Sequence, residues 1–460
     1  MKRPSIETLM FNSSERLESV LRQMNGIGSR FAFAVDDERR LVGIVTDGDV
    51  RRAFLNGADL ASPADIVINH RPISYPDGHA PRQYREFLVR DKVFVAPLVD
   101  PDRRLVDFVS LETTVGSPNE VWMDGGETVL VTGGAGYIGS ILCRLLLDAG
   151  YCVRVLDNLA FGLAPIEALL ERPGFELLRE DIRHIEVLDR AIFGVDRIIH
   201  LAAIVGDPAC QLDSAKAITS NLFATQAMAE IARRYRVKQF IFASSCSVYG
   251  NSGESWADET SPVEPASLYS ETRLDAESYL LKLNNSEFCT TIARLATVFG
   301  LSPRMRFDLV VNVLAAHAVS NREITIFGPE QFRPFIHVTD VAAALMQMIQ
   351  APLERVAGQI FNVGSDKENY TMEALGRLVT ETVDGTRISI QPGHADPRSY
   401  RISCAKIADR LGFACRTSVS EGIREVSNAL EGGRISDHSE FRFSNLKTLE
   451  RQAFQIMDTR

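Results

Sequence analysis

The chain has 460 residues, of which 45% are hydrophobic and 24% are charged, and its formal net charge is −10 at pH 7. These values are typical of a folded protein with a sizeable core and two or three domains. The negative charge argues against a nucleic-acid-binding protein and against binding to anionic membranes. The seven cysteines include no Cys-x-x-Cys pair, which favours reduced thiols over a disulfide scaffold or a zinc site. With no apolar run of about 18 residues, we expect a cytoplasmic protein with no metal, nucleic-acid partner or membrane partner.

Residues 1–115 carry an internal repeat. The first half shows the order helix, strand, turn, strand, helix at residues 14–24, 31–35, 36–39, 41–45 and 49–55. The second half shows helix, strand, turn and strand in the same order at residues 82–89, 93–99, 100–103 and 105–109. A repeat of this size predicts that neither half buries its apolar face alone.

The clearest motif of this repeat is Gly43-Ile44-Val45-Thr46-Asp47-Gly48-Asp49. By this Gly-x-x-Thr-x-x-Asp pattern the repeat resembles a tandem pair of CBS domains, α+β modules that often bind adenine nucleotides. The resemblance implies that Thr46 and Asp49 contact phosphate and ribose. The second half departs from the pattern at Asp107 and Thr113, so we expect at most one nucleotide site. A spacer or dimerisation module without a ligand is the alternative.

The rest of the chain is expected to be α/β. Residues 116–126 are predicted to be a linker because they combine glycine, serine and proline. From residue 127 short apolar strands alternate with helical patterns, which predicts a Rossmann-type doubly wound parallel sheet over 127–430. A smaller substrate-binding part is expected mostly within 297–430, and residues 431–460 are expected to form a loosely attached polar tail.

A glycine-rich turn, Thr132-Gly-Gly-Ala-Gly-Tyr-Ile-Gly139, lies between a β-rich run and a helical pattern. Such a turn brings backbone N–H groups and the positive end of a helix close to a diphosphate. The next predicted strand ends in Asp157, whose carboxylate would accept hydrogen bonds from ribose hydroxyls and repel the 2′-phosphate of NADP. Asp181 follows another strand and could accept from the adenine amino group. These features predict NAD binding.

Further motifs follow in order: His200-Leu201-Ala202-Ala203, Ser244–Gly250, Ser267–Arg273, Arg333–Asp340 and Phe361–Ser365. With the glycine-rich turn, they make residues 127–430 resemble an extended short-chain dehydrogenase/reductase of the NAD-dependent epimerase/dehydratase family, near the UDP-galactose 4-epimerase branch. The resemblance implies NAD as cofactor and a nucleotide sugar as substrate. It also implies cofactor contacts from Gly133, Gly136, Tyr137, Ile138, Gly139, Asp157, Asn158, Asp181, Ile182, Leu201, Ala202, Ala203, Tyr269 and Arg273.

Tyr269 is the predicted catalytic base, because removing hydride from a sugar carbon also requires removing its hydroxyl proton. A phenol titrates near about 10, so it needs nearby positive charge to act near neutral pH. By family register Ser245 would hydrogen-bond the reacting oxygen. The family motif Tyr-x-x-x-Lys is Tyr269-x-x-x-Arg273 here, and arginine keeps the charge but is wider than lysine and cannot lose its proton. This change leaves three possibilities: an active enzyme with shifted geometry, a slowed enzyme, or an NAD-binding protein without turnover. We expect that activity is retained.

The residues after Ser245 indicate the type of reaction. Dehydratases of the family carry an acidic pair there and decarboxylases a glutamate at the second place, whereas this chain has Cys246 and Ser247. Without an acid for elimination, we expect oxidation at C4, rotation of the 4-keto sugar and return of hydride to the other face, which is epimerisation. The alternatives are a dehydrogenase or ketoreductase that releases its product, and a sensor that binds NAD and a nucleotide sugar without turnover.

The resemblance also implies the substrate contacts. Arg333 and Arg398 stand at the two sequence positions where members of the family bind the phosphates of the substrate. Bidentate guanidinium contacts suit a diphosphate. Asn312 is a further expected contact, whereas Thr297 replaces an asparagine common in the epimerase branch and leaves the nucleotide and the sugar open. A homodimer is expected.

Overall fold

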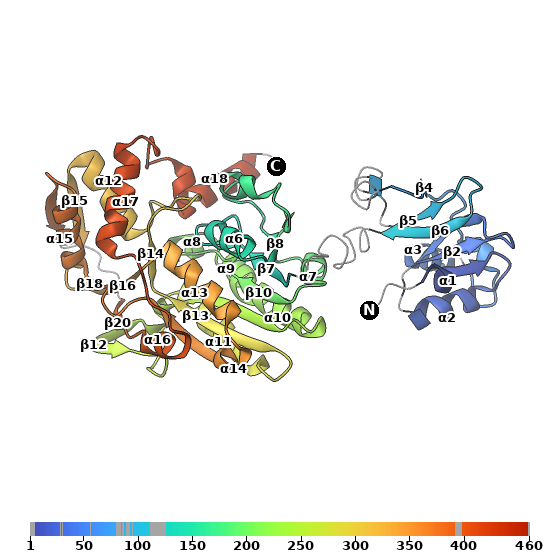
Figure 1. Cartoon of the computed structure of the whole chain (residues 1–460), viewed down its shortest axis with the longest axis horizontal. Helices are drawn as coiled ribbons and strands as arrows, with labels where there is room; N and C mark the ends of the chain where they lie inside the picture. Colours follow the sequence, from blue (N-terminus) through green and yellow to red (C-terminus); the bar gives the residue numbers. More distant parts are fainter. Residues whose placement is uncertain are drawn as a thin grey trace. The chain divides into compact units, whose positions relative to one another are not determined.

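The computed structural model describes residues 5–27, 29, 31–55, 57–79, 84, 87–88, 93, 95–110, 126–391 and 398–458. The chain divides into two compact units, Met1–Asp124 and Gly125–Arg460 (Figure 1). The predicted linker lies outside the described residues except for Gly126, as do Thr113 and most of the predicted helix at 82–89. Each unit is therefore described by itself.

The amino-terminal unit contains two small sheets with the same strand order. The first comprises β1 (Met10–Asn12), β2 (Phe31–Val35) and β3 (Leu41–Thr46), and the second comprises β4 (Tyr75–Pro76), β5 (Val95–Val99) and β6 (Leu105–Ser110). In each sheet the first pair of strands is parallel and the second is antiparallel with one register shift. Helices in the first half are α1 (Ile6–Leu9), α2 (Leu17–Ile27), η1 (Ala64–Val67) and α3 (Asp47–Leu55). The strand order confirms the internal repeat.

The two halves of this unit meet in a shared apolar cluster, although each half also has a cluster of its own. Three aromatic rings from both halves meet there with centroids 5.3, 5.5 and 5.8 Å apart: Phe31, Phe33 and Phe108. The turns also exchange backbone hydrogen bonds, because Leu41 N donates to Arg103 O and Leu105 N donates to Arg39 O, both at 3.0 Å. Neither half buries its apolar face alone, as the repeat predicted.

The second unit is built on a seven-stranded parallel sheet. Its strand order is β17-β13-β11-β10-β7-β8-β9. The strands are β7 (Thr128–Thr132), β8 (Cys152–Leu156), β9 (Phe175–Leu178), β10 (Arg197–His200), β11 (Gln239–Ser245), β13 (Cys289–Leu295) and β17 (Gln359–Val363). The strand order reverses between β7 and β10, and ligands of such sheets bind beyond the carboxyl ends of the strands at that point. The predicted doubly wound sheet is confirmed.

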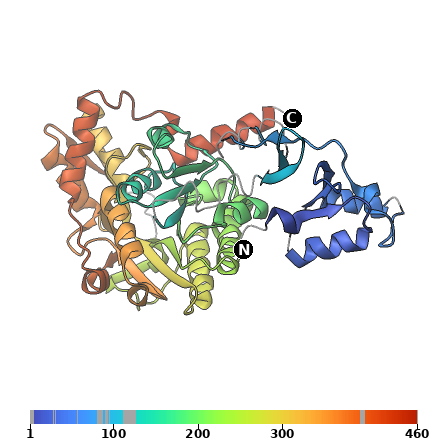
Figure 2. The ribbon, with the colours of Figure 1, turned by 45° about the vertical axis from the view of Figure 1, so that its right-hand side comes forward.

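Helices cover both faces of this sheet (Figures 1 and 2). On one face α6 (Gly139–Asp148) and α13 (Val338–Gln350) bury their apolar sides in one cluster. On the other face, a second cluster contains side chains of α7 (Ile185–Ile192), α10 (Ala224–Arg234) and α11 (Leu268–Leu283). Because both faces are covered, the strands are almost continuously buried, as expected for a parallel sheet.

A third apolar cluster forms the smaller part beyond the sheet. Its main helices are α12 (Val310–Asn321), α15 (Met372–Thr382) and α17 (Val419–Glu431). Its short strands are β14 (Thr297–Phe299), β15 (Glu323–Phe327), β16 (Phe332–His337), β18 (Asn369–Thr371) and β19 (Arg387–Gln391), while β12 (Asn251–Ala257) pairs with β20 (Ser399–Ile402). Shorter helices are η2 (Ala164–Leu169), α8 (Asp207–Leu212), α9 (Ser214–Ile218), η3 (Thr219–Phe223), η4 (Cys246–Tyr249), α14 (Leu353–Val356) and α16 (Ala405–Leu411).

The expectation of a loosely attached tail is wrong. Residues after α17 form η5 (Phe441–Phe443) and α18 (Asn445–Asp458), and they pack on the body of the unit. Phe307 N donates to Phe443 O at 2.9 Å, and Asn445 and Thr448 are buried. Many side chains of the segment are exposed, but Asn445 and Gln452 hydrogen-bond to the body of the unit and hold the segment in place. No helix in the part of the chain that the structure describes is long and apolar enough to cross a membrane.

Candidate active site

A cavity of about 670 Å³ opens at the carboxyl ends of the central strands. The residues that follow four of these strands line it: Gly133 after β7, Asp157 after β8, Leu201 after β10 and Ser245 at the end of β11. Because the strand order reverses between β7 and β10, this is the place at which a doubly wound sheet binds its ligand. The smaller part of the unit closes the other side of the cavity through Arg333 and its neighbours.

The glycine-rich turn is shaped by close backbone contacts. Gly133 has a φ of +73°, and a Cβ on Gly139 would lie 2.3 Å from Gly133 O. Glycine is therefore required at both positions, because a side chain would open the turn. The turn leads directly into the amino-terminal end of α6, and Gly136, Tyr137 and Ile138 also line the cavity. This arrangement directs backbone N–H groups at a bound diphosphate.

The neighbouring strand end supplies an anchored carboxylate. Asp157 accepts hydrogen bonds from Ala135 N at 2.9 Å and Leu159 N at 2.8 Å. Burial raises the pKa of Asp157, while these two backbone donors act in the opposite direction. Asn158 lines the cavity beside it. The carboxylate is therefore fixed at the end of β8, and its predicted contact with the adenosine ribose stays a prediction.

Asp181 and Ile182 line the same end of the cavity after β9. Burial acts to raise the pKa of Asp181, but hydrogen bonds from Arg183 outweigh it and the pKa lies below its ordinary value. The Arg183 Nη2–Asp181 Oδ2 distance is 2.7 Å. Asp181 is thus an ionised acceptor already engaged with an arginine. Leu201, Ala202 and Ala203 complete this side of the cavity.

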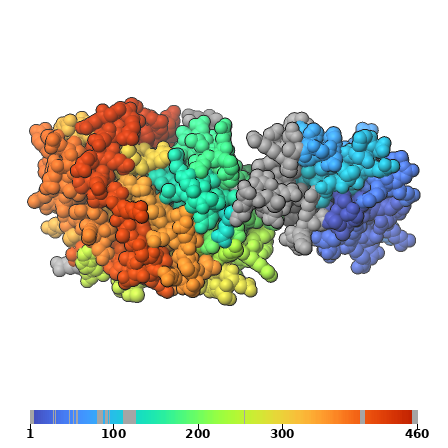
Figure 3. Space-filling view, in the orientation of Figure 1, coloured from blue at the N-terminus to red at the C-terminus, as the bar shows by residue number. Residues whose placement is uncertain are grey.

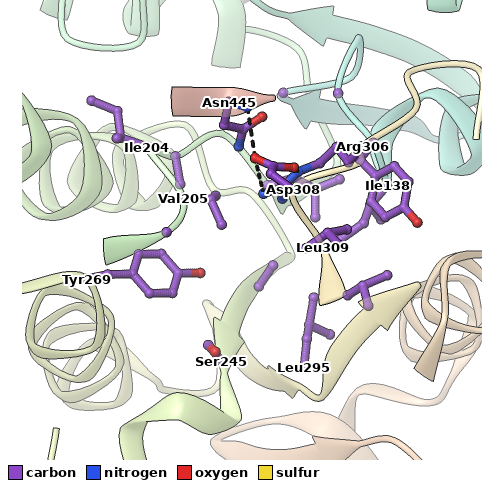
Figure 4. Close-up of a pocket in the computed structure, with 18 of the residues that line it drawn as sticks. Ile138, Ile204, Val205, Ser245, Tyr269, Leu295, Arg306, Asp308, Leu309 and Asn445 are labelled. Carbon is purple, nitrogen blue, oxygen red and sulfur yellow. Dashed lines mark hydrogen bonds and ion pairs between the residues drawn. The ribbon is translucent and has the colours of Figure 1, made fainter. Parts of the chain in front are cut away.

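Ser245 and Tyr269 extend into the cavity from different elements (Figure 4). Ser245 ends β11, and its Oγ accepts a hydrogen bond from Ser247 N at 3.2 Å. Tyr269 lies in the first turn of α11, whose amino terminus is fixed by a capping box between Ser267 and Ser270. The cap and the strand end therefore set the positions of the two hydroxyl groups.

Arg273 lies one helical turn after Tyr269 and is 1% exposed. Its guanidinium carbon is 5.1 Å from the Phe242 ring centroid and 5.4 Å from that of Tyr269, and its Nη1 donates to Ala243 O at 3.4 Å. Its Nε and Nη2 are buried without a hydrogen-bond partner in the protein. Buried donors left without a partner are costly, so a ligand with acceptor oxygens fits here. The ribose hydroxyls of a dinucleotide meet this requirement.

Burial and charge have opposite effects on the pKa values of Tyr269 and Arg273. Burial raises the pKa of Tyr269, and the charge of Arg273 acts to lower it. Burial also lowers the pKa of Arg273, which the neighbouring Tyr269 partly offsets. Arg273 is thus the strongest of the positive charges acting on the phenol, followed by Arg306.

The two predicted diphosphate-binding arginines line the cavity together. Arg333 Nη1 donates to the backbone oxygen of Arg398, and its guanidinium lies 5.7 Å from the Tyr400 ring centroid. Arg398 forms an ion pair with Asp207 at 3.0 Å. The second carboxylate oxygen of Asp207, Oδ1, is buried without a hydrogen-bond partner. Two guanidinium groups and one carboxylate therefore lie together at the end of the cavity that Arg333, Arg398 and Asp207 line.

The expected ligand contact from Asn312 is wrong. Its side chain is fully buried and does not line the cavity. It donates to Tyr137 Oη at 3.1 Å and to Arg306 O at 2.8 Å, and it accepts from Gly300 N at 2.9 Å. Because these bonds use both N–H donors of the amide and the side chain lies outside the cavity lining, Asn312 positions Tyr137 and the loop at 300–306.

Several cavity residues were missed by the sequence analysis. They are Asp207 and Lys216, then Arg304, Arg306 and Asp308 in the loop after β14, and Asn445, Leu449 and Gln452 of α18. In Arg304-Met305-Arg306-Phe307-Asp308, charged residues alternate with apolar ones, and this pattern could have indicated that the loop contributes to a polar site. No local pattern indicated α18, because it joins the site only through contacts with residues far away in the sequence.

The two predicted CBS ligands lie together in the amino-terminal unit. Thr46 donates to Asp49 Oδ2 from its backbone N at 2.9 Å and from its Oγ1 at 2.6 Å, at the start of α3. Asp49 Oδ1 accepts from Arg52 Nη2 at 2.5 Å. The polar groups of Thr46 and Asp49 thus bond to the protein itself. Nucleotide binding by these two residues stays a prediction.

Comparisons with known proteins identify the two parts of the chain. The model of the NAD dependent epimerase/dehydratase family matches residues 129–364, and that of the CBS domain matches residues 1–56. The chain is 30% identical over 310 residues to UDP-glucuronic acid decarboxylase 2 of Arabidopsis thaliana, covering 65% of this chain and 67% of that protein.

Two solved structures are similar in fold. UDP-glucose 4-epimerase of Thermotoga maritima with UDP-glucose has a TM-score of 0.60 and 26% identity, covering 67% of this chain and 99% of that one. UDP-glucuronic acid 4-epimerase of Bacillus cereus, solved with UDP-glucuronic acid and NAD, has a TM-score of 0.60 and 25% identity, covering 66% and 99%. The cofactor of the chain is NAD, which the orphaned donors of Arg273 and the carboxylate of Asp157 fit. The chain belongs to the NAD-dependent epimerase/dehydratase family and carries a CBS domain at its amino-terminal end.

Proposed function

We propose that the chain is an NAD-dependent nucleotide-sugar epimerase that inverts the sugar at C4. The observation that carries the proposal is the absence of an acid beside Ser245. Cys246 is fully buried, its Sγ donates to Arg294 O at 3.2 Å, and burial raises the pKa of the thiol far above its ordinary value. Ser247 does not supply an acid either. Elimination of water or decarboxylation therefore lacks the acidic residue that these reactions use in this family.

The residues that remain suffice for reversible oxidation at C4. When bound, NAD would supply the hydride acceptor and donor. Tyr269 would take the proton of the C4 hydroxyl and later return it, and Ser245 would hold the reacting oxygen through a hydrogen bond. Arg273 would lower the pKa of Tyr269 and orient the nicotinamide-side ribose through its free Nε and Nη2. The cavity would leave room for the keto sugar to turn and present its other face to the nicotinamide ring.

Substrate binding is proposed at the arginine-rich end of the cavity. Arg333 and Arg398 would hold the diphosphate by bidentate hydrogen bonds. Because Arg398 is paired with Asp207, the diphosphate would compete with this carboxylate for the guanidinium. Asp207 would then be free to accept hydrogen bonds from a sugar hydroxyl.

Substitution of the base tests the proposal. Tyr269→Phe removes the phenolic oxygen and keeps the ring, so we expect the rate of sugar interconversion to fall by about 10²–10⁴-fold. Tyr279→Phe is the matched control, since Tyr279 lies on the same helix but its hydroxyl donates to Glu230 outside the cavity. If Tyr269→Phe interconverts the sugars at the rate of the parent protein, the mechanism is wrong.

For the amino-terminal unit we propose one adenine-nucleotide site at Thr46 and Asp49. The CBS match covers residues 1–56 and includes both. A nucleotide would have to displace Arg52 from Asp49, because the two form an ion pair. A unit that only spaces or dimerises the enzyme would show no nucleotide binding.

A further inference from the structure

Helix α18 presents one face to the cofactor end of the cavity. Asn445, Leu449 and Gln452 line the cavity, and their spacing of four and three residues places them on the same side of a helix. Lys447 lies on the exposed side. The helix begins 81 residues after the family match ends at residue 364, so the family match itself does not include this wall.

Three hydrogen bonds hold this face against the walls of the cavity. Gln452 Nε2 donates to Ala160 O at 2.7 Å. Arg304 Nη2 donates to Asn445 Oδ1 at 2.6 Å, and the backbone N of Asn445 donates to Asp308 Oδ2 at 2.8 Å. Asp308 is itself paired with Arg306, and Figure 4 shows Asn445 close to Asp308 and Arg306. The helix is thus attached both to the loop after β8 and to the loop after β14.

These contacts lie over the part of the cavity that fits adenosine. Ala160 and Phe161 follow Asp157, the carboxylate that would accept from the adenosine ribose. The Arg304 guanidinium lies 4.1 Å from the centroid of the Phe161 ring, within cation–π range. Figure 3 shows the red atoms of the carboxy-terminal end beside green atoms of the Rossmann part, in agreement with the Gln452–Ala160 bond.

Arg304 also carries a free donor. The side chain is 4% exposed and lines the cavity, and its Nε is buried without a hydrogen-bond partner. Burial lowers the pKa of Arg304 to about 10, so the group is still cationic at neutral pH. A buried cation with an unused donor at the cofactor end fits the anionic and hydroxyl oxygens of a dinucleotide.

We propose that α18 and Arg304 form the outer wall of the NAD site and retain the cofactor between turnovers. The inference rests on NAD as the cofactor and deepens the proposed function, because an epimerase must keep the reduced cofactor until the same sugar takes the hydride back. NAD would leave only when α18 detaches from Ala160 and Asp308. The wall residues are positioning residues and take no part in proton transfer.

The rate of NAD release tests the proposal. Gln452→Glu is nearly isosteric but replaces the amide donor by a carboxylate facing Ala160 O, and Asn445→Ala with Gln452→Ala removes both side-chain contacts. We expect Gln452→Glu to release NAD about fivefold faster and the double variant about thirtyfold faster, which is the change in rate that corresponds to the loss of one and of two hydrogen bonds. Lys447→Ala, on the exposed side of the same helix, is the control and should release NAD at the parent rate.

Release is measured by loading the full-length protein with labelled NAD and following its loss during a chase with unlabelled NAD. Thermal unfolding is recorded in parallel, so that a folding defect is recognised. Folded variants that release NAD at the parent rate would overturn the proposal. Faster release in a protein that does not epimerise sugars would support the wall and refute the proposed reaction, so the two failures are distinguishable.

Discussion

Replacement of Arg273 by methionine tests how the site activates its base. Arg273→Met keeps an unbranched apolar side chain between the rings of Phe242 and Tyr269 but removes the charge. The guanidinium carbon lies 5.4 Å from the Tyr269 ring centroid. With an effective dielectric constant of about 20, a unit charge near this distance is worth roughly 2–3 kcal/mol. Loss of that stabilisation of the phenolate corresponds to a rate lower by roughly 30- to 160-fold near neutral pH.

The sign of the pH dependence follows from the same contact. Burial raises the pKa of Tyr269 and Arg273 lowers it, so removal of Arg273 moves the pKa further up. Because the base acts as the phenolate, the rate of the variant should rise with pH over a more alkaline range than that of the parent. Part of the lost activity should therefore return at alkaline pH.

The assay is the rate of sugar interconversion as a function of pH at saturating NAD. Saturation is needed because the free donors of Arg273 are also expected to bind the cofactor ribose, and NAD affinity is measured separately by titration. Arg273→Lys is the companion variant: a large gain in turnover would mean an enzyme impaired by arginine, and a loss would mean a site built around it. A pH profile of Arg273→Met that coincides with that of the parent would refute the electrostatic role.

Three further predictions follow from single contacts. Asp157→Asn removes the charge that disfavours a 2′-phosphate, so the preference for NAD over NADP should fall about tenfold in binding titrations; an unchanged preference would contradict the assignment. Glu277→Gln leaves Arg294 buried without its ion pair and should lower the melting temperature by roughly 5–10 °C, whereas the exposed control Glu373→Gln should hardly change it. Asp49→Ala should abolish adenine-nucleotide binding measured by calorimetry, and binding that persists would place the ligand elsewhere.

The sheet and its cofactor turn could be predicted because their signals are local. A strand, a glycine-rich turn and a helix succeed one another within about twenty residues, and the carboxyl ends of parallel strands meet at one edge. Gly133, Asp157 and Ser245 therefore line one cavity although they are far apart in the chain. Tyr269 and Arg273 were assigned through the resemblance to the family motif Tyr-x-x-x-Lys, whose spacing places both residues on one face of a helix.

The parts that escaped prediction depend on distant contacts. The amide of Asn312 is used by Tyr137 Oη, 175 positions away in the sequence, and no pattern around Asn312 reveals that partner. Polar residues of α18 read as a solvated tail, yet Gln452 bonds to Ala160, 292 positions earlier. Composition cannot distinguish a side chain that meets water from one that meets a backbone carbonyl of the same protein.

The central claim is that the site epimerises a nucleotide sugar with a retained cofactor. The most direct measurement is an NMR screen of nucleotide sugars with the full-length protein in deuterated water, without added NAD. The account predicts interconversion of C4 epimers with no solvent deuterium at C4, because the hydride removed from the sugar is returned to it. A product that has lost carbon dioxide or water, or an oxidised sugar released with reduced cofactor, would contradict it.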